Sequence, residues 1–317
     1  MKPNPMHETD VAAVTPSDAV SLSDAPRRAL LGGGVSMTSK WATWGPGILL
    51  GILLVVLYDH IAVKLVRDWL EISDYSHGPL IPFFAAFLLW DKREELRRTP
   101  VTPSWAGVWL VVLGLFALVV GIFGADLFIQ RTSFVLLTAG LIWTLLGKAM
   151  LGKLKFVLFV LLLAIPLPAV VFNQITFPLQ LRASEYSSAL LRLAQVPVLQ
   201  DGNIIQLPAM QLEVAEACSG IRSLMSLFTV AVIYGYFLER GVWRRVVLAL
   251  ASIPIAVAAN VVRIFGTGMC VQYWDPEKAM GFFHEFSGWL MFLVSLGLLY
   301  LVHLAMNVVR PERRRPA

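Results

Sequence analysis

The sequence predicts an all-α polytopic membrane protein with about eight transmembrane helices. Of its 317 residues, 57% are hydrophobic and only 15% are charged, and the mean hydropathy is +0.70. The apolar residues form long runs separated by basic residues, and a spanning helix needs about 20 mostly apolar residues. This composition excludes a water-soluble domain, so the net charge of +5 and the pI of about 9.3 report membrane topology and not nucleic-acid binding.

The N-terminal residues 1–44 are expected to form a disordered cytoplasmic tail. They are rich in proline, serine, aspartate and glycine, and they lack an apolar core of the length found in signal peptides. One membrane domain is expected over residues 45–309, followed by a short basic cytoplasmic tail over residues 310–317. The eight predicted spans are residues 45–63, 78–90, 105–123, 127–146, 154–172, 219–238, 246–269 and 282–308.

The lysines and arginines between these spans predict the orientation of the chain. Cytoplasmic loops carry an excess of these residues close to the helix ends. With the N-terminus inside, the inner segments contain 17 lysines and arginines and the outer segments contain five, and every loop follows this bias. Both termini are therefore expected in the cytoplasm. The sequence shows no internal repeat of the kind that marks many transporters.

Residues 173–217 form the one long segment on the predicted outer side. From Ile175 to Leu193 the apolar residues recur at helical spacing, which predicts an amphipathic helix lying on the outer face of the membrane. From 204 to 214 the apolar residues alternate on either side of a Pro-Ala break, which predicts a short β-hairpin between spans five and six. This hairpin leads directly into the sequence Glu216-Ala217-Cys218.

A few polar and ionisable residues lie within the predicted spans, and these are candidate functional residues. A charged side chain inside a span costs roughly 2.5–3.5 kcal/mol on insertion scales, so the chain retains few of them. By the predicted topology they gather at one depth, near the outer surface. Three spans supply them: Cys218 and Arg222 on the sixth, Asn260 and Arg263 on the seventh, and His284 with Ser287 on the eighth.

These groups suit acyl transfer by a cysteine. The pKa of a thiol falls at a helix N-terminus and beside cationic groups, and Cys218 is expected to have both. A neutral His284 accepts the thiol proton and returns it to the leaving amine, while Arg263 stabilises the oxyanion of the tetrahedral intermediate. The pattern therefore predicts a thiol nucleophile in a membrane-embedded site.

Each of these residues also has a simpler interpretation. A cysteine in a span is most often a packing residue, which suits Cys270 better than Cys218, and a disulfide between the two is an alternative. Ser219 lacks the Gly-x-Ser-x-Gly motif of a serine nucleophile. His284-Glu285 begins like a zinc-protease motif, but position 288 is glycine. With two cysteines in the chain, we expect neither a metal nor another cofactor.

Four sequence motifs together resemble a known family. They read EACSGIRS from residue 216, NVVRI from residue 260, HEFSGW from residue 284 and YSHGPLIP from residue 75. In this order and among this number of spans, they resemble the exosortase/archaeosortase family of membrane-embedded cysteine transpeptidases. The resemblance runs from about residue 58 to residue 309, and the block around Cys218 is its most specific part.

This resemblance implies an enzyme of the bacterial inner membrane with its active site facing the periplasm. Exosortases act on secreted proteins that carry a C-terminal sorting signal, which consists of a Pro-Glu-Pro type motif, a transmembrane helix and a basic tail. They are thought to cleave near the motif, with hydrolysis and transfer to an acceptor as the two outcomes. The family's catalytic positions fall on Cys218, Arg263 and His284. The supporting positions are Arg222, Asn260, Glu216, Ser219, Ser287 and His77.

Two other classes of protein fit the same spans. A transporter or channel would place buried arginine and asparagine along a substrate path near the bilayer midplane. We expect the polar residues at one face only, with no matching set on the cytoplasmic side, and this expectation argues against a transporter. A scaffold in envelope polysaccharide assembly would need no chemistry from Cys218 and would tolerate its replacement by alanine.

Overall fold

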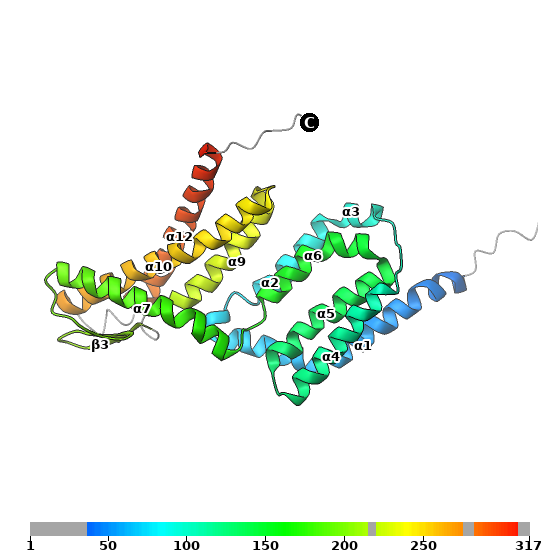
Figure 1. Ribbon diagram of the computed structural model, residues 1–317, viewed down its shortest axis with the longest axis horizontal. Coiled ribbons are helices and arrows are strands. Elements are labelled where there is room, and N and C mark those ends of the chain that lie inside the picture. The colour runs from blue at the N-terminus through cyan, green and yellow to red at the C-terminus, as the bar shows by residue number, and fades with distance from the viewer. Residues whose placement is uncertain (1–36, 215–219, 275–281, 310–317) are drawn as a thin grey trace, which may run out of the picture. The chain divides into compact units, whose positions relative to one another are not determined.

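The computed structural model describes residues 37–214, 220–274 and 282–309 (Figure 1). The chain divides into two units, residues 1–56 and 57–317, and the described part of the first unit is the beginning of the first helix. The described residues are mostly helical. In order, the helices are α1 (Met37–Glu71), the short 3-10 helix η1 (Ser73–Tyr75), α2 (Leu80–Asp91), α3 (Arg93–Arg98), α4 (Ala106–Phe123), α5 (Leu127–Leu146), α6 (Lys148–Leu163), α7 (Ala169–Leu193), α9 (Gly220–Leu238), α10 (Val242–Tyr273) and α12 (Phe282–Val309).

The predicted tails lie mainly outside the described residues. Residues 1–36 and 310–317 are among those that the structure does not describe, so the disordered and basic tails stay predictions. The first helix, α1, begins at Met37, within the stretch that the sequence assigned to the N-terminal tail. The described helix therefore starts earlier than the predicted membrane domain.

Five described helices are long and apolar enough to cross a membrane. These candidate spans are Gly47–Glu71, Ala106–Phe123, Leu127–Leu146, Val242–Tyr273 and Phe286–Val309, and Arg222–Leu238 is a shorter apolar helix. Their outward side chains are apolar, as shown by Phe116 on α4 and Leu301 on α12, which are 64% and 57% exposed. So much exposed apolar surface is expected of helices that face lipid. The protein is therefore a membrane protein.

The predicted count of eight spans is not confirmed. The second predicted span corresponds to α2, whose 12 residues extend about 18 Å, well short of the roughly 30 Å of bilayer hydrocarbon. The fifth, predicted over residues 154–172, is interrupted because α6 ends at Leu163 and Pro166 and Pro168 follow. The chain then starts a new helix, α7, at Ala169.

Helices α4 and α5 make the most extensive helix pair, and glycines allow it. Gly107, Gly114 and Gly121 recur every seven residues along one face of α4 and are all buried. A Cβ on Gly114 would lie 2.8 Å from the backbone nitrogen of Leu137 on α5. Small residues of this kind let the backbones of membrane helices approach closely.

The predicted amphipathic helix is confirmed as a helix and is longer than expected. In α7 the predicted apolar residues Ile175, Tyr186 and Leu193 are exposed. Its buried face contains small residues, and the hydroxyl of Ser187 donates to the carbonyl oxygens of Ala183 and Val261 at 2.6 and 3.3 Å. Helix α7 therefore packs on α10 through small side chains, and its position on the outer membrane face stays a prediction.

The predicted hairpin is confirmed and belongs to a sheet of three strands. Strand β2 (Ile204–Gln206) pairs antiparallel with β3 (Gln211–Glu213), and an additional strand, β1 (Leu199–Asp201), pairs with the other side of β2. The apolar side chains of the sheet are buried against α7 and α10. The sheet therefore covers these two helices at the point where the chain approaches Cys218 (Figure 1).

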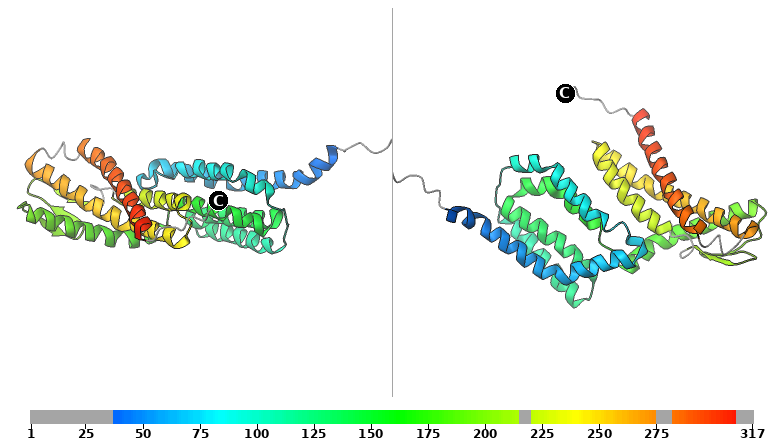
Figure 2. Two further views of the ribbon diagram at one scale, coloured as in Figure 1. Left: turned by 90° about the horizontal axis from the view of Figure 1, so that it is seen from above. Right: turned by 180° about the vertical axis from the view of Figure 1, so that it is seen from behind.

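Helix α10 is the centre of the C-terminal helix group. It contacts α7, α9 and α12, which Figure 2 shows from two further directions. Buried side chains from α9, α10 and α12, including Leu227, Leu248 and Leu299, form a common apolar core. The helices that carry Asn260, Arg263 and Ser287 are thus packed directly against one another.

Candidate active site

Part of the predicted site lies outside the described residues. Residues 215–219, which include Glu216, Cys218 and Ser219, are not described, and nor is the side chain of His284. The described neighbours are Val214, at the end of the sheet, and Gly220, the first residue of α9. The backbone of His284 lies in the first turn of α12.

Arg263 is buried in α10 and faces the beginning of α12. Its side chain is 4% exposed, and its Nε donates to the Ser287 hydroxyl at 3.4 Å. Its Nη2 lies 3.1 Å from the position that a Cβ on Gly288 would occupy. Ser287 and Gly288 follow His284 by three and four residues, so the three positions share one helix face. The structure therefore brings Arg263 to the face of α12 on which His284 lies.

Gly288 leaves the space in which the Arg263 guanidinium lies, so Gly288→Ala is expected to impair the site. The added methyl group would press on Nη2 and shift the guanidinium by a few tenths of an ångström. Small misplacements of a group that acts on the substrate reduce rates strongly, so with Arg263 in the catalytic role expected from the sequence, substrate processing should fall about tenfold. Turnover of a sorting-signal protein in membranes measures this effect. Gly297→Ala is the matched control, because a Cβ there meets nothing within 4 Å.

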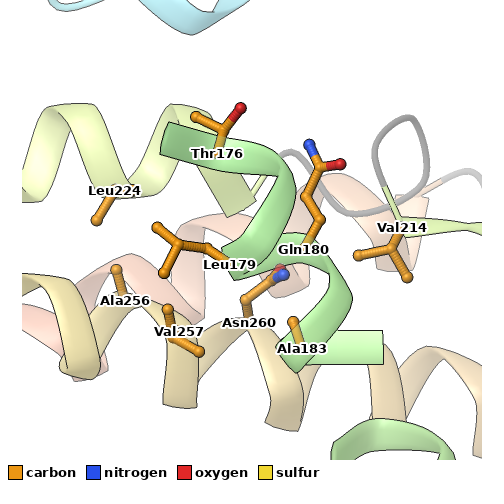
Figure 3. A pocket seen from close by; sticks show the side chains of 9 residues that line it. All are labelled: Thr176, Leu179, Gln180, Ala183, Val214, Leu224, Ala256, Val257 and Asn260. Atoms are coloured by element: carbon orange, nitrogen blue, oxygen red, sulfur yellow. The ribbon is translucent and has the colours of Figure 1, made fainter. Parts of the chain in front are cut away.

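Asn260 lies one turn before Arg263 on α10 and borders a small cavity. The cavity has a volume of about 20 Å³ and is also lined by Gln180 of α7 and by Val214 (Figure 3). The Oδ1 atom of Asn260 is buried and has no hydrogen-bond partner among the described residues. Asn260 therefore presents a polar group beside Val214, the residue before the segment that contains Cys218.

Arg222 lies near Asp74, a residue that the sequence analysis did not single out. Helix η1, which contains Asp74, packs against α9, which contains Arg222. Burial raises the pKa of the Asp74 carboxyl, and the positive charge of Arg222 acts in the opposite direction. Asp74 directly precedes the Tyr75-Ser76-His77 motif, and this position could have identified it as a candidate site residue from the sequence.

The Tyr75-Ser76-His77-Gly78 segment packs against the connection between α6 and α7. The Leu167 N–H donates to the Tyr75 hydroxyl at 3.1 Å, and the Trp69 indole donates to the Ala164 carbonyl at 2.7 Å. The same indole ring lies so close to Gly78 that no Cβ fits there. Part of this motif therefore has a structural role.

His77 borders a larger and mostly apolar cavity of about 470 Å³. Burial lowers the pKa of His77, which favours the neutral imidazole. The cavity is lined by residues of the α1–α2 connection, the end of α6, and helices α7, α9 and α10. It shares Leu179 and Leu224 with the small cavity beside Asn260. His77 thus lies on the apolar side of the candidate site, and its role stays a prediction.

Two buried polar clusters were missed from the sequence. Arg131 of α5 is 3% exposed and pairs with Asp68 of α1. The second cluster joins Glu239 to Arg244 and His303, at the ends of α9, α10 and α12 opposite to Arg263. The expectation of no matching polar set on the predicted cytoplasmic side was therefore wrong. Reading one helix at a time could not show that these side chains meet.

The described residues also bear on the cysteine and metal alternatives. Cys270 is a free cysteine, and its side chain packs against the apolar cluster beneath the sheet. This placement supports a packing role for Cys270. Among the described residues, no group of three or more His, Cys, Asp and Glu side chains is arranged to bind a metal ion.

Comparison with known families decides the relationship. A family model described as transmembrane exosortase matches residues 69–301. The chain belongs to the transmembrane exosortase family. The match includes the segments with His77, Cys218, Arg263 and His284 in this exosortase. No similar protein was found among the curated proteins, and no similar structure among the solved structures.

Proposed function

We propose that this exosortase is a membrane cysteine peptidase or transpeptidase that cleaves the C-terminal sorting signals of secreted proteins at the periplasmic membrane face. Cys218 is the nucleophile, Arg263 the oxyanion stabiliser and His284 the proton carrier. Arg222, Asn260, Glu216, Ser219, Ser287 and His77 support them. The bilayer and the sorting-signal proteins are the partners of this enzyme.

The observation that carries this proposal is the burial of Arg263 against the start of α12. A buried guanidinium in a spanning helix is costly, so its retention indicates a function. It lies beside Ser287 and Gly288, one turn from His284. This placement supports the proposal that Arg263 and His284 provide oxyanion stabilisation and proton transfer between α10 and α12.

The proposed reaction proceeds through a thioester. His284 accepts the proton of the Cys218 thiol, the thiolate attacks the scissile carbonyl carbon, and the negative charge on the carbonyl oxygen is stabilised by Arg263. The C–N bond then breaks, and the leaving amine takes a proton from His284. Water or an amine acceptor attacks the thioester carbonyl and gives a proton to His284, and the C–S bond breaks to release Cys218 as a thiolate.

The edge of the sheet offers a path by which the substrate reaches Cys218. Leu207 and Val214 donate backbone hydrogen bonds to Met210 and Asn203. The backbone N–H and C=O groups of the even-numbered residues in the β3 segment therefore point toward β2. The backbone groups of Gln211 and Glu213 consequently point to the outer edge of the sheet, where β3 is the edge strand. An extended cleavage motif adds beside this strand, whose last residue, Glu213, precedes Cys218 by five residues in the sequence.

The proposed orientation predicts that Cys218 is accessible from the periplasm. A membrane-impermeant thiol reagent applied outside is expected to label Cys218 in a Cys270→Ala background and to block processing. A bound sorting-signal peptide should slow this labelling, because the peptide and the thiol reagent occupy the same site. Mass spectrometry of the labelled protein measures the rate. Labelling only after the cytoplasmic face is opened would invert the topology and contradict the placement of the active site.

A further inference from the structure

A second group of polar side chains joins the three helices of the candidate site at their other ends. Glu239 follows α9, Arg244 lies in the first turn of α10, and His303 and Asn307 lie near the end of α12. The Glu239 side chain is 1% exposed. Glu239 and His303 are buried among α9, α10 and α12, and Arg244 and Asn307 are partly buried there.

Four contacts close this network into a ring. Arg244 Nη1 lies 3.1 Å from Glu239 Oε2, and Glu239 Oε1 lies 2.9 Å from His303 Nδ1. Asn307 Nδ2 lies 3.0 Å from His303 Nε2, and Arg244 Nη2 donates to Asn307 Oδ1 at 2.8 Å. We name these four residues the polar ring. The two contacts of Glu239 are ion-pair distances without hydrogen-bond alignment.

The donors and acceptors of the polar ring assign the orientation of the Asn307 amide and the tautomer of His303. Arginine has no acceptor, so the atom of Asn307 that faces Arg244 must be the amide oxygen. The Asn307 amide N–H group therefore faces His303 Nε2, which must accept. The imidazole proton is then on Nδ1, beside the Glu239 carboxylate. Glu239 and Arg244 supply one carboxylate and one guanidinium to the ring.

The polar ring and the candidate site lie at opposite ends of the same helices. Arg263 follows Arg244 by 19 residues on α10, and His303 follows His284 by 19 residues on α12. Glu239 follows Gly220, the first residue of α9, by 19 residues as well. At 1.5 Å per residue each separation is about 28 Å, close to the thickness of bilayer hydrocarbon.

We propose that Glu239 is a positioning residue for the candidate active site, because the polar ring sets the relative tilt of α9, α10 and α12. This inference rests on the proposed function. A tilt of about 5° at the ring moves the far end of a 28 Å helix by roughly 2.5 Å. A misplacement of about 1 Å near the reacting atoms reduces a rate about 10²-fold. Arg263 keeps its position against Ser287 only if the ring stays closed.

Two variants open the ring in different ways. Glu239→Gln removes the charge and leaves the buried Arg244 without its carboxylate, which disturbs the ring most. Asn307→Leu removes the link between Arg244 and His303 but keeps the ion pair between Glu239 and Arg244, so it gives a result if the first variant does not accumulate. Glu94→Gln is the matched control, since Glu94 is an exposed carboxylate paired with Arg97 on α3.

The first measurement is the distance between spin labels on α10 and α12 in full-length protein in bilayers. Labels at the exposed positions Val262 and Trp289 lie next to Arg263 and Gly288. Both native cysteines are replaced by alanine for this measurement. We expect one narrow distance distribution with the intact ring and with Glu94→Gln. We expect a broader distribution, or one shifted by about 2 Å, with either ring variant.

The second measurement is processing of a sorting-signal protein, with both native cysteines present. We expect kcat per folded molecule to fall at least tenfold in the ring variants, with KM within about twofold. An unchanged distance distribution and unchanged kcat, with less folded protein, would overturn the positioning role and leave the ring as a stabiliser. A different outcome is that the ring variants change the distances but the unmodified protein does not cleave the sorting signal. That result would refute the proposed function and leave the effect of the polar ring on helix tilt intact.

Discussion

Cys218→Ala is expected to abolish processing of a sorting-signal protein while the variant still inserts into the membrane in normal amounts. Formation of the proposed thioester needs a thiolate. A water molecule in the place of the Cys218 side chain is a weaker nucleophile than the thiolate and is not held in a fixed position. Loss of a nucleophile that acts through a covalent intermediate lowers kcat by several orders of magnitude. A pulse-chase assay of the substrate, with immunoblotting of the enzyme, measures both quantities.

The second cysteine supplies the control for this experiment. Cys270 is partly buried in α10 and packs beneath the sheet, so Cys270→Ala should process the substrate almost as the unmodified protein does. Cys218→Ser should be nearly inactive, since a serine hydroxyl is far weaker than a thiolate at neutral pH. Retention of most of the activity by Cys218→Ala or Cys218→Ser would refute the thioester mechanism and favour a scaffold.

Hydropathy located the apolar segments of the chain but did not predict the residues at which the helices end. The segment over residues 154–172 has enough apolar residues for a span, yet Pro166 and Pro168 divide it into α6 and α7. The apolar run before Trp90 is real, but α2 has only 12 residues. Helix length depends on where the backbone hydrogen bonds stop, and composition does not report this.

Alternation of apolar residues predicted the hairpin because the side chains of a strand point to opposite faces. Strand β1 was missed, although Gly202-Asn203 between β1 and β2 forms a two-residue hairpin turn with glycine at its first position. Gly202 has a φ of +60°, which this turn requires. Strand β1 has only three residues, so its side chains give little alternation, and the turn was its main signal in the sequence.

Helical spacing predicted that Asn260 and Arg263 share one face of α10 and that Ser287 lies one turn after His284. The contact between Arg263 and Ser287 joins α10 to α12, and the placement of the His284 side chain stays a prediction. The polar ring was missed because its members are distant in sequence and meet only when three helices pack. His303 and Asn307, four residues apart on one face of α12, were the available signal.

The family relationship and the polar ring bear differently on the transporter alternative. Polar residues occur at both ends of α9, α10 and α12, so their distribution does not exclude a transport path. The ring is closed, and its charges balance within Glu239 and Arg244. Membership of the transmembrane exosortase family is therefore the observation that favours an enzyme over a transporter.

Arg263→Lys is expected to be nearly inactive, with processing reduced about 10²-fold or more. Lysine keeps the charge but lacks the planar fork that reaches Ser287 through Nε and lies against Gly288 through Nη2. Loss of one oxyanion donor typically costs about 2.7–4 kcal/mol of transition-state stabilisation, which corresponds to this loss in rate. Single-turnover measurements of cleavage separate this effect from substrate binding.

Arg222→Lys is the matched comparison, and the difference between the two arginines tests the assignment. Arg222 is exposed at the start of α9 and acts on Asp74 by its charge, which lysine preserves. We therefore expect a decrease of less than about fivefold for Arg222→Lys, because a charge interaction with one solvent-exposed partner contributes little. Equal and mild effects at both positions would contradict the role of Arg263 as oxyanion donor. In that case the burial of Arg263 against α12 would serve helix packing, and the negative charge of the intermediate would need another donor.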